Sequence, residues 1–289
     1  GSMADAAFRY NRRPREEFQM TMPNQTCLLA LVAVALLAAA CSTSPTGRSQ
    51  LVLRSDAALE LEGERQFAII RDQAPMVQDG PTIQYVSCVA DAIVGVLEGD
   101  DADLPWEMAI VNQPDINAHV LPGGKIVVKA GILSVANNQH QLAAVLGHEV
   151  AHVTAHHANE RASRGMVTGA GVEVAALILG GGYYNQTRGA YEALSAGAAL
   201  GVMNPFSRKQ ETEADVVGLE YMARAGFDPR ESVELWKNMN ARQDNKIPEY
   251  MSTHPSGDTR IENLVAQYPH VLKLYNEAQA NGKNPNCTR

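Results

Sequence analysis

Positive charge is scarce in this chain. Its 289 residues hold 24 lysines and arginines against 32 aspartates and glutamates, which gives a net charge of −8. Nucleic-acid binding needs a basic surface to neutralise phosphates, so this balance argues against a nucleic-acid partner. Aromatic residues are also few, at 6%, but apolar residues make up 45% of the chain. That is enough for a globular core.

A long hydrophobic run is missing as well. A membrane-spanning helix needs about 20 apolar residues in succession. Residues 28–40 supply only 13, a length typical of the core of a secretory signal peptide. We therefore expect residues 1–40 to be a leader that is removed. Residues 165–203 are rich in glycine and alanine but are interrupted by charge, so we expect core helices there, with a mobile lid as the alternative.

Cysteine occurs only four times. Cys27 falls in the expected leader. Cys41 directly follows three alanines, and small residues before a cysteine resemble the site at which bacterial lipoproteins are cleaved and lipidated. We expect a lipid on Cys41 and a flexible polar tether over residues 41–54. The alternative is an ordinary secretory signal that ends near a cysteine by chance.

The remaining cysteines, Cys88 and Cys287, form an even pair. In the oxidising compartment that a secretory leader implies, such a pair is expected to form a disulfide. The alternative is two free thiols. The link would join the polar end of the chain to a helix predicted over residues 81–97, inside one domain that spans residues 55–289.

The spacing of apolar residues predicts an α+β fold that is mainly helical. A helical repeat runs through residues 81–97 and again through residues 137–164, which we expect to be one long helix. Short apolar runs predict strands at 106–111 and 125–129. An extended segment at 117–122 leads into a Pro-Gly-Gly turn.

The strongest chemical signal is the H-E-x-x-H sequence from His148 to His152. Two histidines four positions apart lie on one face of a helix, and their imidazoles can bind one Zn²⁺. Glu149, beside the first histidine, can then act as general base and general acid on a zinc-bound water. The alternative is a pair of core histidines whose polar groups are satisfied without a metal.

A catalytic zinc needs a third protein ligand and an open fourth position. Glu211 and Asp215 lie one turn apart on a second predicted helix. We expect Glu211 to bind zinc, and Asp215 to accept the second N–H of a ligand histidine and so fix its tautomer. Glu213 is predicted to face away from Glu211, on a solvated acidic face.

At this point the chain resembles a known family. The sequences Gly-His-Glu-Val-Ala-His-Val around His148 and Ser-Arg-Lys-Gln-Glu-Thr-Glu-Ala-Asp around Glu211 are similar to those of the gluzincin metallopeptidases of the HtpX and CAAX-prenyl-protease group. Residues 46–50 resemble the start of its periplasmic lipoprotein (LoiP-like) members. Residues 225–229 and 252–255 match two further signatures. The resemblance covers nearly all of the chain after the leader.

The resemblance implies a gluzincin domain with a small edge sheet beside the H-E-x-x-H helix. It implies one Zn²⁺ per chain, held by His148, His152 and Glu211, with Glu149 as the general base. Asp215 would position a ligand histidine. His254 would be a mobile group near the open coordination position, where it could either block the site or assist the reaction. The alternative for His254 is a loop histidine that caps a helix.

A substrate-binding strand is also implied. The family docks the substrate backbone on the strand that corresponds to Asn117, Ala118, His119, Val120 and Leu121. His119 stands where the family usually has an aromatic residue, which leaves substrate preference open. His157 also matches a family position and is interpreted as structural.

We therefore predict a zinc metalloendopeptidase that hydrolyses unfolded or misassembled cell-envelope proteins. The resemblance implies an outer-membrane lipoprotein that faces the periplasm, is held to the membrane by Cys41, and works with outer-membrane assembly machinery. The alternative is a chaperone-like assembly factor that binds more than it cleaves. The presence of Glu149 favours the enzyme, because binding alone needs no base. A structural zinc protein is disfavoured by the three-ligand pattern.

Overall fold

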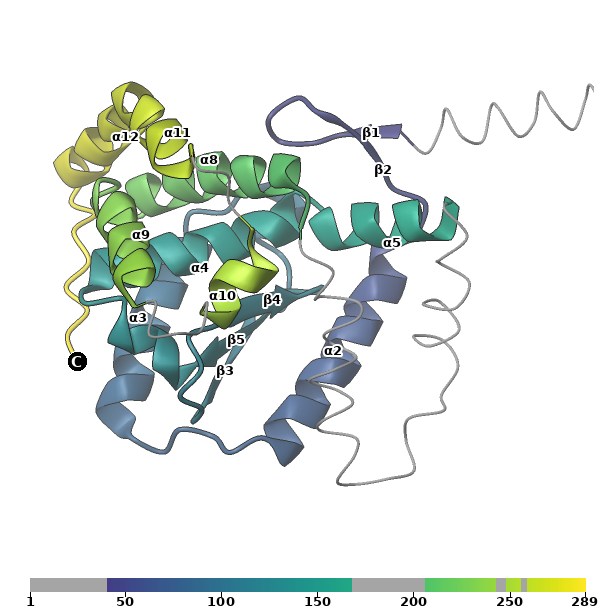
Figure 1. The fold of residues 1–289 in the computed structure, drawn as a ribbon, viewed down its shortest axis with the longest axis horizontal. Coiled ribbons are helices and arrows are strands. Elements are labelled where there is room, and N and C mark those ends of the chain that lie inside the picture. Colours follow the sequence, from purple (N-terminus) through teal and green to yellow (C-terminus); the bar gives the residue numbers. More distant parts are fainter. Residues whose placement is uncertain (1–40, 168–205, 243–247, 256–258) are drawn as a thin grey trace, which may run out of the picture. The chain divides into compact units, whose positions relative to one another are not determined.

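The computed structural model describes residues 41–167, 206–242, 248–255 and 259–289 (Figure 1). The expected leader, residues 1–40, lies outside this described part. So does nearly all of the stretch 165–203 that we expect to form core helices or a lid.

The described part of the chain is mainly helical. Its helices are α2 (Asp56–Gln73), α3 (Gly80–Val94), α4 (Gln139–Thr154), α5 (His157–Val167), α8 (Arg208–Arg224), α9 (Glu231–Ala241), α10 (Glu249–Thr253), α11 (Arg260–Ala266) and α12 (Tyr268–Ala280), with short 3₁₀ helices at Gly99–Asp101 and Ala130–Ser134. Its strands are β1 (Cys41–Thr43), β2 (Ser49–Leu51), β3 (Glu107–Val111), β4 (Ala118–Leu121) and β5 (Lys125–Lys129). These elements confirm the α+β prediction. Within the described residues, no helix is long and apolar enough to cross a membrane.

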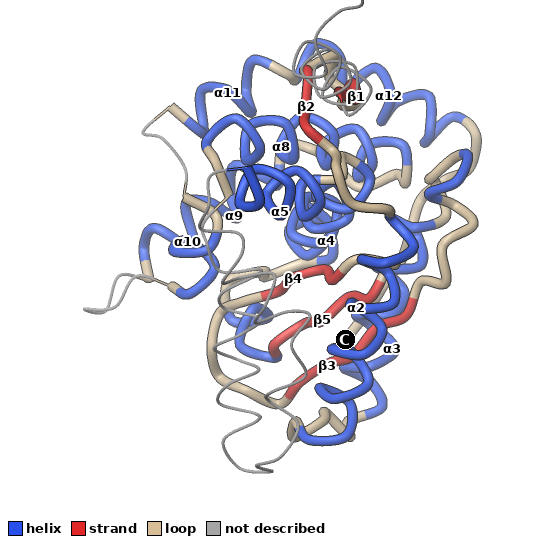
Figure 2. The backbone as a smooth tube through the Cα atoms, turned by 90° about the vertical axis from the view of Figure 1, so that its right-hand side faces the viewer, coloured by secondary structure: helices blue, strands red, loops and turns tan. Residues whose placement is uncertain are grey.

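A three-stranded sheet lies beside α4 (Figure 2). β5 is central, parallel to β3 and antiparallel to β4. The predicted Pro-Gly-Gly turn joins β4 to β5, and Gly123 and Gly124 have φ angles of 77° and 73°, which side chains rarely tolerate. α2 covers one face of the sheet through Phe67, Ala74, Ala109, Val111, Leu121 and Val127. α3 and α4 cover the other face.

The core is centred on α4, which packs along α8 (Figure 1). Leu142, Val145, Leu146 and Val150 of α4 are fully buried, as their predicted helical spacing requires. Gly147 of α4 faces Gly218 of α8. A Cβ atom at Gly147 would lie 2.8 Å from the carbonyl oxygen of Gly218. The paired glycines therefore let the two helices approach closely.

The helix predicted over residues 137–164 is broken in the structure. α4 ends at Thr154 and α5 begins at His157. Between them His156 adopts a left-handed conformation, with a φ angle of 51°, which a continuous helix cannot contain. Apolar spacing alone cannot reveal the break, because the residues that α5 buries beyond it are mainly polar, such as His157, Glu160 and Ser163.

The N-terminal segment differs from the flexible tether that we expected. β1 and β2 pair antiparallel around a Pro-Thr-Gly turn in which Gly47 has a φ angle of 84°. Arg48 then forms ion pairs with Glu160 of α5 at 2.6 Å and Glu213 of α8 at 2.8 Å. Residues 41–51 are therefore a hairpin docked on the helical core.

Cys88 and Cys287 form a disulfide, as predicted. Their Cα atoms are 5.7 Å apart and 199 positions separate them in the sequence. The backbone N–H of Cys287 also donates to the Gln139 side chain, at 2.7 Å, at the start of α4. The last residues of the chain are thereby held against α3 and α4.

Candidate metal centre

Two histidines of α4 point toward one carboxylate of α8. Nε2 of His148 lies 3.0 Å from Nε2 of His152, and these atoms lie 3.3 and 3.5 Å from oxygens of Glu211. The histidines share a face because they are four residues apart. Glu211 lies in the first turn of α8, which begins with a capping box formed by Ser207 and Gln210. The structure thus brings the three predicted ligands together.

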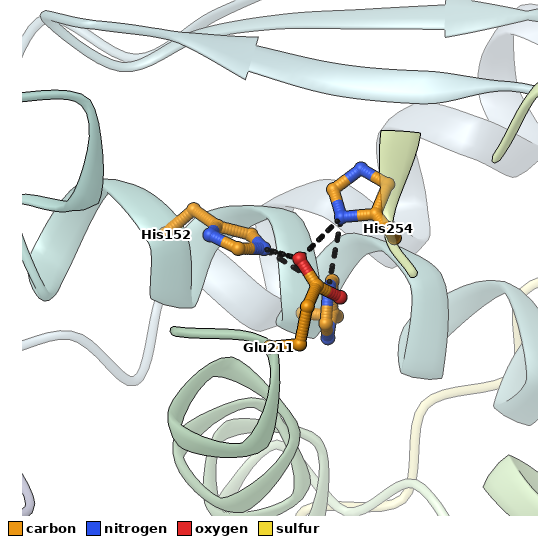
Figure 3. A group of neighbouring side chains, drawn as sticks. His152, Glu211 and His254 are labelled. Carbon is orange, nitrogen blue, oxygen red and sulfur yellow. Dashed lines mark hydrogen bonds and ion pairs between the residues drawn. The ribbon is translucent and has the colours of Figure 1, made fainter. Parts of the chain in front are cut away.

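His254 joins this group. It caps the C-terminus of α10, yet its ring faces the ligands (Figure 3). Its Nδ1 lies 3.1 Å from Oε1 of Glu211 and 3.3 Å from Nε2 of His148. Tyr250 and Phe206, which the sequence did not single out, stack against His254 with ring centroids at 4.5 and 5.4 Å.

The donor set fits zinc. The four ligand atoms, from His148, His152, Glu211 and His254, lie within 4.8 Å of one another. Ligands of a tetrahedral zinc with bonds of about 2.0–2.2 Å lie roughly 3.3–3.5 Å apart, close to the separations given above. Burial also lowers the pKa of His152 far below its ordinary value, which favours the neutral ring that a zinc ligand must have. Zinc is therefore the metal that these residues suit.

Asp215 holds the far nitrogen of His148. Its Oδ1 lies 3.0 Å from Nδ1 of His148, as expected from its position one turn after Glu211. Burial of His148 disfavours its charged ring, but the hydrogen bonds to Asp215 and Glu211 outweigh this and raise the pKa of His148 to about 9. The carboxylate therefore fixes the ring so that Nε2 faces the ligand group.

Arg260 supports the same carboxylates, a role that was not predicted from the sequence. Its guanidinium donates to Asp215 at 2.5 Å and to Glu211 at 3.4 Å. The guanidinium also stacks on the Trp236 ring, 3.7 Å from the centroid. Arg260 thus balances the charge of two acids whose side chains are largely buried.

Glu149 lies next to the ligand group without belonging to it. Its side chain is 2% exposed, and its Oε1 lies 3.3 Å from Nε2 of His254. Burial raises the pKa of Glu149, an effect that the neighbouring His254 and His148 oppose. A carboxyl group with a raised pKa both accepts and returns a proton readily near neutral pH, which suits a general base.

Glu213 is buried, which corrects the expectation of a solvated face. It does point away from Glu211, as helical spacing predicts, but the β1–β2 hairpin and α5 cover that side. Its carboxylate accepts hydrogen bonds from Ser44, Thr46, Arg48 and His157. Burial would raise the pKa of Glu213, but these hydrogen bonds outweigh it and hold the pKa far below its ordinary value. Glu213 is therefore an ionised acid inside the protein.

The predicted substrate strand lies at an edge of the sheet, beside the ligand group. β4 pairs only with β5 among the described strands, and Asn117 precedes it. A cleft of about 480 Å³ reaches from Val120 and Pro122 to His152. Asp56, Glu60, Asp100 and Asp101 also line this cleft. Of the four residues of the ligand group, His152 is the one that lines this cleft.

Known proteins of two kinds are similar to this chain. It is 38% identical over 209 residues to the mitochondrial metalloendopeptidase OMA1 of Schizosaccharomyces pombe, covering 72% of this chain and 57% of that protein. The human metalloendopeptidase OMA1, mitochondrial, is 32% identical, with 79% and 46% covered. The β-barrel assembly-enhancing protease of Escherichia coli K12 is 27% identical, with 69% and 41% covered. The chain thus spans about half the length of the relatives it matches.

These names contradict the predicted localisation. Relatives from fungi, a plant and mammals are named as mitochondrial enzymes, so the prediction of a bacterial outer-membrane lipoprotein is wrong. That prediction depended on a short apolar run, on the small residues before Cys41 and on the resemblance of residues 46–50 to lipoprotein members of the family. Such segments are targeting signals that are recognised by other proteins, and different targeting systems use signals of similar composition.

Residues 84–267 match the model of peptidase family M48. This span contains the H-E-x-x-H helix, Glu211, Asp215 and His254. The match confirms the predicted class of zinc metalloendopeptidases, while the finer LoiP-like branch is not part of it. Because the family model matches more than half of its length and its ligand geometry fits zinc, the chain belongs to peptidase family M48.

Proposed function

We propose that this chain is a zinc-dependent endopeptidase that cleaves unfolded or misassembled polypeptides. The observation that carries the proposal is a buried general base, Glu149, beside a complete set of zinc ligands. Zinc held by His148, His152 and Glu211 would supply a Lewis acid that polarises the peptide carbonyl and acidifies water. A purely structural metal site would have no use for Glu149.

Glu149 would move the protons of the reaction. Its carboxylate takes a proton from the attacking water and then returns it to the leaving amine of the cleaved peptide bond. Both transfers need a carboxyl group whose pKa lies near the working pH. The closed surroundings of Glu149, which raise its pKa, favour this use.

Substrate would dock on the free edge of β4. The N–H of Lys129 donates to the carbonyl of Asn117 at 3.0 Å, so Asn117 is hydrogen-bonded to β5. Because such pairs alternate in an antiparallel ladder, the backbone groups of Ala118 and Val120 face the open edge. Strand addition there binds backbone and tolerates varied side chains, which suits an enzyme for unfolded chains.

His254 would hold the enzyme in a latent state. With its Nδ1 among the ligand atoms, it takes the fourth position that a catalytic zinc must keep open. Movement of residues 252–255 would clear that position. The same ring, displaced by a short distance, could then donate a hydrogen bond to the oxyanion.

The substrate class is drawn from the relatives and remains part of the proposal. The bacterial relatives are named for β-barrel assembly, which makes misassembled β-barrel proteins the first substrates to test. A His254 that took the fourth position of a bound zinc would favour the second candidate, a chaperone-like factor that binds unfolded chains more than it cleaves them.

One experiment separates the two candidates. Casein is incubated with the zinc-loaded protein, with the protein stripped by a chelator, and with the stripped protein after zinc is restored. An endopeptidase produces fragments in the first and third samples and none in the second. If all three samples leave casein intact while the protein still suppresses aggregation of an unfolded client, the chaperone-like role replaces the enzyme.

A further inference from the structure

His152 has a partner on the side away from the ligand group. Its Nδ1 lies 2.8 Å from Nδ1 of His157, and Nε2 of His157 lies 3.0 Å from Oε2 of Glu213. His157 is fully buried. The helix is interrupted at His156, between these two histidines, where the φ angle is 51°. In a continuous helix, residues five apart face different sides.

The donors around Glu213 determine which atom donates in each hydrogen bond of the series His152–His157–Glu213. Ser44 and Thr46 donate to Oε1 of Glu213, and Arg48 donates to Oε2 at 2.8 and 3.0 Å. An ionised carboxylate only accepts. Nε2 of His157 must therefore carry a hydrogen and donate it to Glu213.

The consequence passes through the ring to the metal ligand. A neutral imidazole with a hydrogen on Nε2 has a lone pair on Nδ1. His157 is fully buried, which favours its neutral form. In that form Nδ1 of His157 can only accept, so Nδ1 of His152 donates to it. This leaves the lone pair of His152 on Nε2, the atom that faces His148 and Glu211.

We propose that Arg48, Glu213 and His157 are positioning residues that fix the tautomer and ring orientation of His152 for zinc. The inference rests on the zinc site of the proposed function. In this proposal, an arginine–carboxylate pair orients each of the two ligand histidines. Arg260 and Asp215 hold His148 directly, whereas Arg48 and Glu213 hold His152 through an inserted histidine.

The β1–β2 hairpin would then complete the metal site. Ser44, Thr46 and Arg48 precede the family match, which begins at residue 84. They are far from the H-E-x-x-H sequence along the chain, yet only two side chains, Glu213 and His157, separate them from a ligand. A purely structural hairpin would lower stability when loosened but would leave zinc binding by the folded protein unchanged.

The second acid bound to Arg48 supplies a matched control. Glu160 is fully buried and pairs with the same guanidinium at 2.6 Å. Within the described residues, its carboxylate bonds to Arg48, Gln210 and Arg164 and makes no hydrogen bond to the His157 ring. Glu213→Leu and Glu160→Leu each remove one buried carboxylate partner of Arg48. Only the first breaks the line to His152.

Zinc release to a chelator is measured for the wild type and both variants, after circular dichroism has shown that each is folded. Glu213→Leu should release zinc roughly 10–100-fold faster, the loss typical when a partner of a ligand histidine is removed. Glu160→Leu should stay within about twofold of the wild type. Equal rates for the two variants, or a wild-type rate for Glu213→Leu, would overturn the inference.

The wild type gives a test that needs no variant. Long-range ¹H–¹⁵N spectra of the zinc-loaded protein should show His152 protonated on Nδ1 and His157 protonated on Nε2. A hydrogen on Nδ1 of His157 contradicts the inference even if both variants fail to fold. If the wild type binds no zinc, the proposed function fails; if it binds zinc with the wrong tautomers, only this inference fails.

Discussion

Nδ1 of His254 lies 3.1 Å from Oε1 of Glu211, the acid that completes the zinc ligands. A fourth protein ligand leaves no room for water on a tetrahedral metal. His254→Ala should therefore raise the rate of peptide hydrolysis while one zinc is still bound, as measured with a fluorogenic peptide and metal analysis. His270→Ala, at an exposed histidine, is the control. A fall in kcat with zinc retained would show instead that His254 assists the reaction.

Glu149→Gln should abolish hydrolysis without loss of metal. The amide keeps the shape of the side chain but cannot take a proton, so we expect kcat to fall by about 10²–10⁴-fold. Metal analysis should still find one zinc per chain. Glu211→Gln is the comparison, because it should weaken zinc binding itself. Loss of zinc from the Glu149 variant would mean that Glu149 is a ligand.

Zinc affinity should rise with pH up to about 9. The pKa of His148 in the metal-free protein is raised from 6.5 to about 9 by Asp215 and Glu211, against the effect of burial. Protonation of His148 stabilises the metal-free fold fully below pH 6.5, and this contribution is lost as the pH rises through about 9. Zinc must displace that proton from Nε2.

Calorimetry checks the proton release. Zinc is titrated into the metal-free protein at pH 7 in two buffers with different ionisation enthalpies, and the difference in heat gives the number of protons released. Asp215→Asn should release fewer protons, because without the carboxylate the pKa of His148 falls. An affinity that stays constant between pH 6 and pH 8 would contradict this assignment.

The disulfide should stabilise the fold without affecting the metal. Closing a loop across 199 positions restricts the unfolded chain, and loss of a native disulfide typically costs about 2–5 kcal/mol. The parent for this test has Cys27 and Cys41 replaced by serine. Urea unfolding compares its stability with that of the same protein carrying Cys88→Ser and Cys287→Ser as well. Two reactive thiols in the unreduced, denatured parent would show that the bond does not form.

Val120→Pro should raise KM for peptide substrates and leave the sheet intact. The N–H of Val120 faces the open edge of β4, so its loss removes a hydrogen bond to substrate and none to β5. His119→Pro is the opposite case, because the N–H of His119 faces β5 and its loss should lower the melting temperature. An unchanged KM for the Val120 variant would place substrate elsewhere.

Each half of the ligand set was predictable from local geometry, whereas the joining of Glu211 to the two histidines followed from the family resemblance. Four residues make one helical turn, which fixes His148 beside His152 and Glu211 beside Asp215 whatever the rest of the fold does. The fate of Glu213 was not local. The spacing correctly turned Glu213 away from Glu211, but only tertiary structure decides whether that side meets water or a docked hairpin.

The break after α4 escaped prediction for a related reason. His156 is a non-glycine residue in a left-handed conformation, and nothing in the apolar repeat marks it. The hairpin was missed because residues 42–50 are polar and contain proline and glycine, a composition shared by linkers and tight turns. Their order depends on charges supplied from 112 and 165 positions away, by Glu160 and Glu213.

Because Gly147 and Gly218 let α4 and α8 approach closely, the zinc ligands on these two helices depend on the distance between the helices. A methyl group at Gly218 would lie 2.7 Å from the backbone nitrogen of His148, so even the smallest side chain would push α8 from α4. Zinc bonds tolerate displacements of only about 0.2 Å, whereas helices survive far larger ones. Strain between these helices would therefore register first as lost metal, with the secondary structure still in place.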